Sequence, residues 1–362
     1  MLSFVHGGNI YDRRIDLDLS VSLNPLGMPE GLREILLSSA SKATAYPEPF
    51  NRTLSKMAGE AFGIPMEHIV FGNGASELIL SFARCFAKKK ALLPIPCFTG
   101  YIYAIKNACP DCDIIYYSLK EEEAFRLDRG IINVIKDERP DILFLTNPNN
   151  PNGALINNSL LSDIALTCEE TGTNLVIDEC FLPFTGKDES DSFLHRLSGK
   201  SNITVLRAFT KTFAIPGVRI GYAATSSDET ADLMRKELPE WNMSTIAQEA
   251  AKYCLKNLSY ETAANSLIIK ERATVTKHLE SEGYKVYPSD CNFVLFKTEK
   301  NEDLFEQFLS KGVLIRDCAN IPGLSKGYYR ISIVDPRGWV LDPRDCPGGP
   351  KWRNNGYSCI HS

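Results

Sequence analysis

The segment at residues 202–222, NITVLRAFTKTFAIPGVRIGY, restricts the possible folds of this chain more than any other. Its first part, Asn202–Leu206, is an apolar β-branched run that predicts a buried strand, and a Pro-Gly pair precedes a second strand containing Arg219. Lys211 lies between the two strands. Long amines prefer water, so a lysine at the end of a central strand is either paired with an anion or used as a nucleophile. A surface lysine in a loop is the alternative.

The residues near Lys211 favour a nearby anion. Thr210 offers a hydroxyl group and Arg219 offers a planar guanidinium group, and together they suit a small dianion such as a phosphate monoester. Such a site needs a second wall, because one hydroxyl and one guanidinium group leave several phosphate oxygens without a donor. The sequence therefore has to supply further donors from another strand end.

A glycine turn, GNGASE at 72–77, can supply them. It follows a predicted strand and opens a predicted helix, so its backbone amides can face an anion at the positive end of the helix dipole. The amides concerned belong to Gly74, Ala75 and Ser76. An ordinary tight turn is the alternative for this segment.

Between about residues 66 and 225, short apolar runs alternate with stretches of helical length. This alternation predicts an α/β fold with a mostly parallel seven-stranded sheet covered by helices on both faces, in which ligands bind beyond the carboxyl ends of the strands. The predicted strands are His68–Phe71, Ala91–Ile95, Ile114–Tyr117, Ile142–Thr146, Asn174–Asp178, Ile203–Arg207 and Val218–Ala224. The predicted helices between them are Ala75–Ala87, Gly100–Ala108, Leu127–Lys136 and Leu160–Thr171.

A second, smaller α/β unit is predicted after a mainly helical stretch at 230–282. Its strands are expected at Tyr284–Tyr287, Phe293–Phe296, Val313–Ile315 and Tyr329–Ile333, around a helix at Glu302–Lys311. We therefore expect a large domain at 46–228 and a small domain formed by 1–45 and 229–333. Residues 334–362 are rich in Pro, Gly and Cys, and they are expected to form an irregular tail.

Two polar groups follow neighbouring strands of the predicted sheet. Asn150, in NPNNPNG at 147–153, carries a side-chain amide that suits a phenolate oxygen, although Asn and Pro also simply build turns. Asp178 ends an apolar strand, where an unpaired charge costs several kcal/mol and needs a cationic partner. A protonated pyridine nitrogen is one such cation, and a structural carboxylate that caps the next turn is the alternative.

Candidate substrate-binding groups come from both ends of the chain. Arg316 and Arg330 lie on or beside strands of the small unit, and two guanidinium groups can hold two anionic groups of one small molecule, such as a carboxylate and a phosphate. His6 and Gly7 belong to HGGN, where glycine permits close backbone approach and the imidazole can donate to a phosphate. Surface arginines and an ordinary amino-terminal loop are the alternatives.

The composition excludes several other classes of protein. A net charge of −5 without a basic cluster argues against nucleic-acid binding, and no apolar run is long enough to span a bilayer. Eleven scattered cysteines indicate reduced thiols rather than a disulfide framework, and Cys109 and Cys112 are expected in a turn before a strand. The five histidines have no metal-ligand spacing. We expect a cytoplasmic protein without a metal.

Taken together, these motifs resemble the threonine-phosphate decarboxylases of cobalamin biosynthesis, which are fold-type I pyridoxal-phosphate (PLP) enzymes similar to histidinol-phosphate aminotransferases. The resemblance implies that Lys211 carries the cofactor, that Asp178 pairs with its ring nitrogen and that Asn150 contacts its ring oxygen. It also implies that Phe98 stacks on the ring and that Tyr46 reaches the cofactor phosphate of a neighbouring subunit in a homodimer. The segments that carry it include HGGN at 6–9, DECF at 178–181 and IRDCANIPGLSKGYYR at 315–330.

The implied reaction is decarboxylation of L-threonine O-3-phosphate to (R)-1-amino-2-propanol O-2-phosphate and CO2. Phosphoserine decarboxylation, transamination of histidinol phosphate and a non-catalytic binding protein remain open as alternatives. The chain departs from the family pattern at Ala208 and Asn152, and Phe181 stands where aminotransferases have a tyrosine. Ser22 and Ser244 replace commonly found asparagines, and a closing amphipathic helix is missing after residue 333.

Overall fold

The large sheet holds seven strands among the residues that the computed structural model describes, which are 6–11, 13–197, 202–300 and 302–335. The strand order is β2-β8-β7-β6-β5-β3-β4, and all neighbours are parallel except β8, which is antiparallel to β2 and β7. The predicted mostly parallel sheet is therefore confirmed. The bounds are β2 Ile69–Gly72, β3 Lys90–Ile95, β4 Asp113–Ser118, β5 Ile142–Thr146, β6 Asn174–Asp178, β7 Ile203–Ala208 and β8 Gly221–Thr225.

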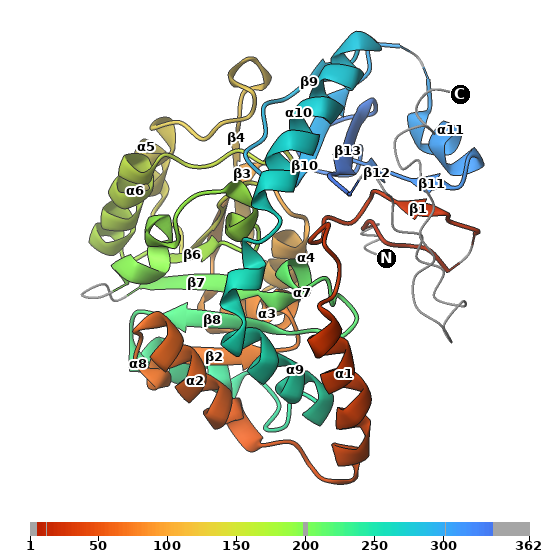
Figure 1. Ribbon diagram of the computed structural model, residues 1–362. Helices are drawn as coiled ribbons and strands as arrows, with labels where there is room; N and C mark the ends of the chain where they lie inside the picture. Colours follow the sequence, from red (N-terminus) through yellow and green to blue (C-terminus); the bar gives the residue numbers. More distant parts are fainter. Residues whose placement is uncertain (1–5, 12, 198–201, 301, 336–362) are drawn as a thin grey trace.

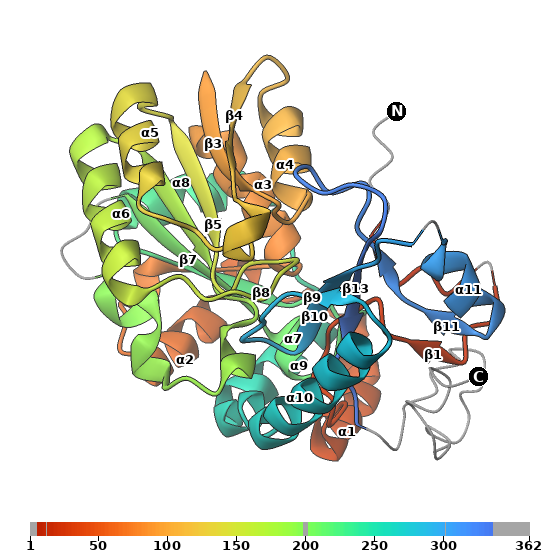
Figure 2. The same cartoon turned by 90° about the horizontal axis from the view of Figure 1, so that it is seen from above.

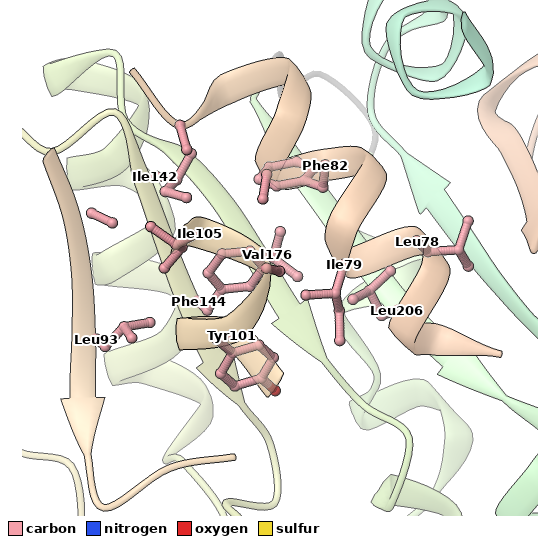
Figure 3. Packing of buried hydrophobic residues seen from close by; sticks show 14 of the residues in the cluster. Leu78, Ile79, Phe82, Leu93, Tyr101, Ile105, Ile142, Phe144, Val176 and Leu206 are labelled. Carbon is pink, nitrogen blue, oxygen red and sulfur yellow. The ribbon is translucent and has the colours of Figure 1, made fainter. Parts of the chain in front are cut away.

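Helices cover both faces of this sheet (Figure 1). In β5, Ile142 and Phe144 pack towards α3 and α4, whereas Leu143 and Leu145 pack towards α5 and α6, because successive side chains of a strand point to opposite faces. Figure 3 shows Phe144 beside Tyr101 of α4 within the first of these layers. The helix bounds are α1 Glu30–Ser39, α2 Arg52–Phe62, α3 Ala75–Phe86, α4 Gly100–Ala108, α5 Gly130–Glu138, α6 Asn158–Thr171, α7 Phe209–Thr212, α8 Asp228–Lys236, α9 Thr245–Lys256, α10 Asn265–Ser281 and α11 Leu304–Ser310.

The β2 end of the large sheet packs against helices from distant parts of the sequence. One apolar cluster joins Leu32 of α1, Leu54 of α2 and Ala250 of α9 to Phe71 of β2 and Tyr222 of β8. Helices α1 and α9 thus lie against the large sheet, although they come from segments that we assigned to the small domain. The division of the chain at residues 46 and 228 stays a prediction.

The smaller unit is a four-stranded antiparallel sheet in the order β12-β13-β10-β9. Helix α10 runs from the side of the large sheet to this small sheet (Figures 1 and 2), and Ile268 and Val275 of the helix pack in two successive apolar clusters. A separate pair of strands, β1 and β11, lies beside it. The bounds are β1 Leu17–Asp18, β9 Lys285–Val286, β10 Phe293–Lys297, β11 Val313–Leu314, β12 Arg316–Asp317 and β13 Tyr328–Ser332.

The direction of β8 differs from that of its neighbours, and this brings Arg219 to the functional edge of the sheet. The amino end of β8 lies where the other strands have their carboxyl ends, so a residue that precedes β8 faces the residues that follow them. The sequence predicts that Arg219 lies within the strand, but it precedes β8 in the structure. Its φ of 62° is left-handed, which interrupts the extended backbone, and β8 begins only at Gly221.

Two smaller expectations have clear outcomes. The turn at Cys109 and Cys112 is confirmed, because the Cys112 amide donates to the Cys109 carbonyl at 3.0 Å directly before β4. In the described part of the chain, no helix is both long enough and apolar enough to cross a membrane. Most of the tail predicted at 334–362 lies outside the described residues, since the description ends at residue 335.

Candidate active site

A cavity of about 290 Å³ lies at the carboxyl edge of the large sheet, between it and the small sheet. Its walls combine groups from the strand ends of one sheet with two arginines of the other, as the sequence predicts. The predicted site residues that line it are His6, Gly7, Ala75, Ser76, Phe98, Asn150, Asp178, Thr210, Lys211, Arg219, Arg316 and Arg330. The other lining residues are Ser20, Val21, Ser22, Ile79, Thr99, Thr146, Cys180, Phe181, Ala208 and Ile321.

Lys211 lies in α7, the single helical turn that begins directly after β7. Its Nζ atom is 5.8 Å from the centre of the Phe181 ring, on the cavity wall. Burial, together with the positive charges of Arg330 and Arg219, lowers the pKa of Lys211 to about 8. About a tenth of the amine is then neutral at pH 7, and the neutral amine is the nucleophilic form.

Asp178 presents a buried carboxylate at the end of β6, where it is 6% exposed. Its donors in the described part of the chain are the Tyr101 hydroxyl at 2.8 Å and the Cys180 amide at 3.0 Å, and neither is a cation. The Tyr101 hydroxyl is itself 2.8 Å from Thr146 Oγ1. A buried carboxylate with only neutral donors, facing a cavity, fits a ligand that brings its own positive charge, such as a protonated ring nitrogen.

The predicted phosphate cup is assembled around Arg219 and the start of α3. A Cβ atom on Gly74 would lie 2.6 Å from Arg219 Nη2, so only glycine allows the guanidinium group to approach this turn. The start of β8 also lies so close to the start of α3 that only glycine fits, because a Cβ on Gly221 would lie 2.6 Å from the Ala75 amide nitrogen. Arg219 Nη2 is 3.5 Å from Ser76 Oγ. A guanidinium group at the start of a twelve-residue helix suits a phosphate group.

Arg316 and Arg330 are direct partners in the register of β12 and β13, so their side chains leave the same face of the small sheet. Both are 8% exposed and line the cavity. Arg330 donates to Asn150 Oδ1 at 2.6 Å and to the Ser20 carbonyl at 2.8 Å, while its buried Nε has no acceptor among the described residues. Burial lowers the pKa of Arg330 to about 10, which is the expected cost of a buried cation.

The amino-terminal segment closes one side of the cavity. A Cβ on Gly7 would lie 2.5 Å from the Ser20 carbonyl, so the segment can dock there only with glycine. Ser20 Oγ donates to Asp18 at 2.6 Å and accepts from the Gly8 amide at 2.8 Å, which fixes the segment. The His6 ring lies 5.6 Å from the Phe98 ring, and burial with the charges of Arg316, Lys211 and Arg330 lowers the His6 pKa. A neutral imidazole can donate a hydrogen bond to an anion.

Two predicted residues do not line the cavity. Gly74 lies behind the turn, against Arg219. Tyr46 is 83% exposed, and its ring lies 5.1 Å from that of Trp241 on the surface. Its predicted role in a neighbouring subunit stays a prediction.

Sequence reasoning missed Tyr101 and Ser20. Tyr101 stands in the same PCFTGY segment as Phe98, three residues further along the start of α4, so a helical spacing was available as a signal. Ser20 belongs to an alternating polar series in DLDLSVS, which is typical of a strand-like segment with one polar face. The contacts of Tyr101 with Asp178 and of the Ser20 carbonyl with Arg330 join residues far apart in the sequence, and only the folded chain shows them.

Comparison with known proteins finds a family and several relatives for this chain. The model of the family "Aminotransferase class I and II" matches residues 15–338. The threonine-phosphate decarboxylase of Salmonella typhimurium is 32% identical over 343 residues, which cover 92% of this chain and 93% of that protein. The histidinol-phosphate aminotransferase 2 of Archaeoglobus fulgidus is 34% identical over 321 residues, or 88% of each chain.

A solved structure agrees with these sequence matches. The crystal structure of the histidinol-phosphate aminotransferase from Clostridium acetobutylicum superposes with a TM-score of 0.80 and 32% identity, covering 88% of this chain and 94% of that one. The relatives thus include both a decarboxylase and aminotransferases, and overall similarity does not separate the two activities.

Proposed function

This chain belongs to the aminotransferase class I and II family, and on that basis we propose that it removes CO2 from L-threonine O-3-phosphate with the help of PLP. The product would be (R)-1-amino-2-propanol O-2-phosphate, an intermediate of cobalamin biosynthesis in the enzymes that the sequence motifs resemble. PLP dependence follows from the family. The choice of substrate and of reaction is the part that we propose.

The observation that carries the proposal is the pair of register-matched arginines in the cavity that also holds Lys211 and Asp178. Arg316 and Arg330 supply two buried guanidinium groups side by side, and their acceptors within the described chain are neutral oxygens. Two buried cations that donate only to neutral oxygens within the described chain call for a ligand with two anionic groups. A phosphorylated amino acid has a carboxylate and a phosphate only a few bonds apart.

PLP, when bound, supplies an electron sink for the pair of electrons that remains on the substrate α-carbon when a bond there breaks. Asp178 would hold the ring nitrogen in its protonated form, and the Tyr101 hydroxyl and the Cys180 amide orient Asp178. Asn150 lies at the cavity wall, where its amide is bonded to Arg330. Lys211 Nζ, whose pKa is about 8, can donate the proton that replaces the carboxylate on the α-carbon.

The arginines and His6 also decide which bond breaks. Only the bond perpendicular to the cofactor ring overlaps the electron sink, so the groups that anchor the carboxylate and the phosphate select the reaction. We propose that Arg316, Arg330 and His6 would hold the carboxylate and the phosphate of the substrate, so that the Cα–carboxylate bond rather than the Cα–hydrogen bond is the one that the cofactor's electron sink weakens. Breaking this bond releases CO2, and a proton takes its place.

Transamination of histidinol phosphate is the rival that the comparisons favour most, given the aminotransferase relatives. Histidinol phosphate has no carboxylate, but the 2-oxo acid that accepts its amino group has two, so the paired arginines alone do not exclude it. Phosphoserine is a rival substrate, since a single methyl group is worth only about 1–3 kcal/mol of discrimination.

The test is an assay of the purified protein reconstituted with PLP. Incubation with phosphothreonine is expected to release CO2 without any 2-oxo acid, and more efficiently than incubation with phosphoserine. Amino transfer from histidinol phosphate to 2-oxoglutarate, without CO2 release from phosphothreonine, would contradict the proposal. A Lys211→Ala variant, carried through the same assay, controls for contaminating activity.

A homodimer with shared active sites is the second part of the proposal. Three large apolar residues, Leu37, Tyr46 and Trp241, are 71%, 83% and 46% exposed, which is the kind of surface that a second copy covers. If Tyr46 completes the neighbouring site, mixing inactive Tyr46→Ala and Lys211→Ala proteins after dissociation should restore about a quarter of the activity at best. No recovery in a mixed dimer of confirmed composition would contradict shared sites. A cytoplasmic location stays a prediction of the sequence.

A further inference from the structure

Arg316 is held in place by two oxygen atoms of its own strand and loop. Its Nη1 donates to the Asp317 carbonyl at 2.7 Å, and its Nη2 donates to Asn320 Oδ1 at 2.7 Å. Both acceptors are uncharged. The hydrogen bonds among the described residues therefore orient the guanidinium group without a carboxylate acceptor, and the only side chain that accepts one of them is that of Asn320.

Another buried arginine of this chain, Arg207, is paired with a carboxylate instead of a neutral oxygen. Arg207 and Glu179 are 3% and 0% exposed at their side chains, and Arg207 Nη2 lies 3.1 Å from Glu179 Oε2. A carboxylate thus cancels the charge of Arg207 in the protein interior, as burial normally requires. Arg316 is nearly as buried, yet an amide occupies the place that a carboxylate takes beside Arg207.

The loop that carries Asn320 is fixed on both sides. The Ala319 amide donates to Asp317 Oδ1 at 2.9 Å, and Ile321 packs in an apolar cluster with Leu119 and Phe125 of the large unit. A Cβ on Gly323, whose φ is +88°, would lie 3.1 Å from the Pro96 nitrogen, so the loop lies directly against the large unit. Asn320 is itself exposed, and it can therefore be replaced without disturbing the core.

We propose that Asn320 is a positioning residue whose uncharged amide oxygen orients Arg316 and adds no negative charge beside it, so that the guanidinium group can bind an anionic group of the substrate. Arg330 has the same arrangement, because its Nη1 bonds the uncharged amide of Asn150. The proposal concerns this one residue and rests on the proposed function only for the identity of the substrate. It predicts that the charge of residue 320, and not merely its presence, controls substrate affinity.

The test compares Asn320→Asp with Asn320→Ala in the PLP-loaded protein. Asn320→Asp keeps the acceptor but adds a negative charge beside Arg316, and it should raise the KM for phosphothreonine by about tenfold or more with a smaller change in kcat. Asn320→Ala loses the orientation but keeps the charge, so its KM should rise only about threefold. Ser325→Asp is the matched control: it adds the same charge at an exposed position of the same loop, and its KM should stay within about twofold of wild type.

A second measurement does not depend on catalysis. Millimolar inorganic phosphate should raise the melting temperature of the PLP-loaded wild type and of Ser325→Asp, and this increase should be lost in Asn320→Asp. Without phosphate, Asn320→Asp should melt no lower than wild type, because the new carboxylate pairs with Arg316. A merely structural role of Asn320 would instead lower the melting temperature of both variants.

An Asn320→Asp protein with wild-type KM and wild-type stabilisation by phosphate would overturn the inference. So would equal losses in Asn320→Asp and Asn320→Ala together with a lower melting temperature in both. If the wild type releases no CO2 from phosphothreonine, the proposed function is wrong, and the phosphate comparison between Asn320→Asp and Ser325→Asp still decides the role of Asn320.

Discussion

Two charged clusters, each with one carboxylate and several donors, connect the large unit with the small sheet. In the first, Glu121 accepts from Lys285 at 2.7 Å, from Tyr287 at 2.7 Å and from Lys297 at 3.2 Å through Oε1, and from Tyr328 at 2.7 Å through Oε2. In the second, the described wall of the cavity combines Asp178 with four lysine and arginine side chains. These four are Lys211, Arg219, Arg316 and Arg330.

The Glu121 cluster stabilises the protein, whereas the charged groups of the cavity are available to bind ligands. Around Glu121 every partner is supplied by the protein, so the carboxylate joins the short helix at Glu121–Glu123 to the strands of the small sheet. In the cavity the cations exceed the acids, which costs stability and is compensated only when anionic ligands bind. Tyr328 of the Glu121 cluster and Arg330 of the cavity lie on the same face of β13. The Glu121 cluster therefore also helps to position Arg330.

Removing the cavity's nucleophile should have the largest effect. Lys211→Ala is expected to lower kcat to below about a thousandth of the wild-type value and to abolish the visible absorbance of covalently bound cofactor. Because burial holds the folded pKa of Lys211 near 8, below its value in the unfolded chain, the buried ammonium costs stability below pH 8, and this cost fades as the pH rises. The ligand-free variant should thus be at least as stable as the wild type at pH 7, as thermal melting can check. A variant that keeps the absorbance would contradict the role of Lys211.

Removing the cavity's acid should have the next largest effect. Asp178→Asn keeps the hydrogen-bonding shape but cannot pair with a protonated ring nitrogen, so kcat should fall by about 10²–10³-fold. The measurement is CO2 release under saturating PLP and phosphothreonine. Wild-type kcat in a variant with full cofactor occupancy would show that Asp178 is structural.

A substitution in the Glu121 cluster should change the stability of the protein rather than its catalytic rate. Glu121→Gln leaves the buried Tyr287 and Tyr328 hydroxyls with a weaker acceptor, and it should lower the free energy of unfolding by about 1–3 kcal/mol at pH 7. Lys285, Tyr287 and the other donors hold the pKa of Glu121 far below its usual range, so this contribution is present above the usual pKa of a glutamate and is lost as the pH falls through the lower, folded value.

Urea unfolding at several pH values checks this prediction, with Glu122→Gln as an exposed control from the same short helix. The stability difference between Glu121→Gln and wild type should shrink in acid. A difference that is equal at all pH values, or equal in the control, would show that the cluster does not act through its charge.

The smallest expected effect is the pH dependence of the rate at which the ligand-free protein takes up PLP. Since the Lys211 pKa is about 8, the neutral fraction of the amine rises about fivefold between pH 7 and pH 8 and then levels off. The initial rate of PLP uptake by the ligand-free protein, followed by absorbance, should rise by the same factor. An uptake rate that still climbs about tenfold between pH 8 and pH 9 would indicate an unshifted lysine.

The sequence predicts strand positions well where both faces are buried. Ile142–Thr146 and Asn174–Asp178 begin and end as expected, because continuous apolar runs between turn residues leave little choice. The strand expected at Val218–Ala224 begins later, since the left-handed backbone of Arg219 has no local signature in a non-glycine residue. Pattern and propensity thus locate strands, while the backbone at a functional turn depends on tertiary contacts.

The site residues also divide into those that the topology predicts and those that depend on tertiary packing. Lys211, Asp178 and Asn150 were predictable because the carboxyl ends of parallel strands meet at one edge, so their convergence follows from the topology. The bond between Tyr101 and Asp178 was not predictable, because it depends on how α4 packs against the sheet. The Glu121 cluster was equally hidden, since its partners lie more than 160 positions away in the sequence.

The most direct test of the central claim follows the hydrogen on the substrate α-carbon. Phosphothreonine deuterated at that carbon is converted by the PLP-loaded wild type, and the amine product is examined by mass spectrometry. Loss of the carboxylate leaves this deuterium in place, so the product should carry one deuterium, with CO2 released in equal amount. A product from which the deuterium has been removed, formed without CO2, would show that the cavity breaks the Cα–hydrogen bond, as an aminotransferase does, and would contradict the account.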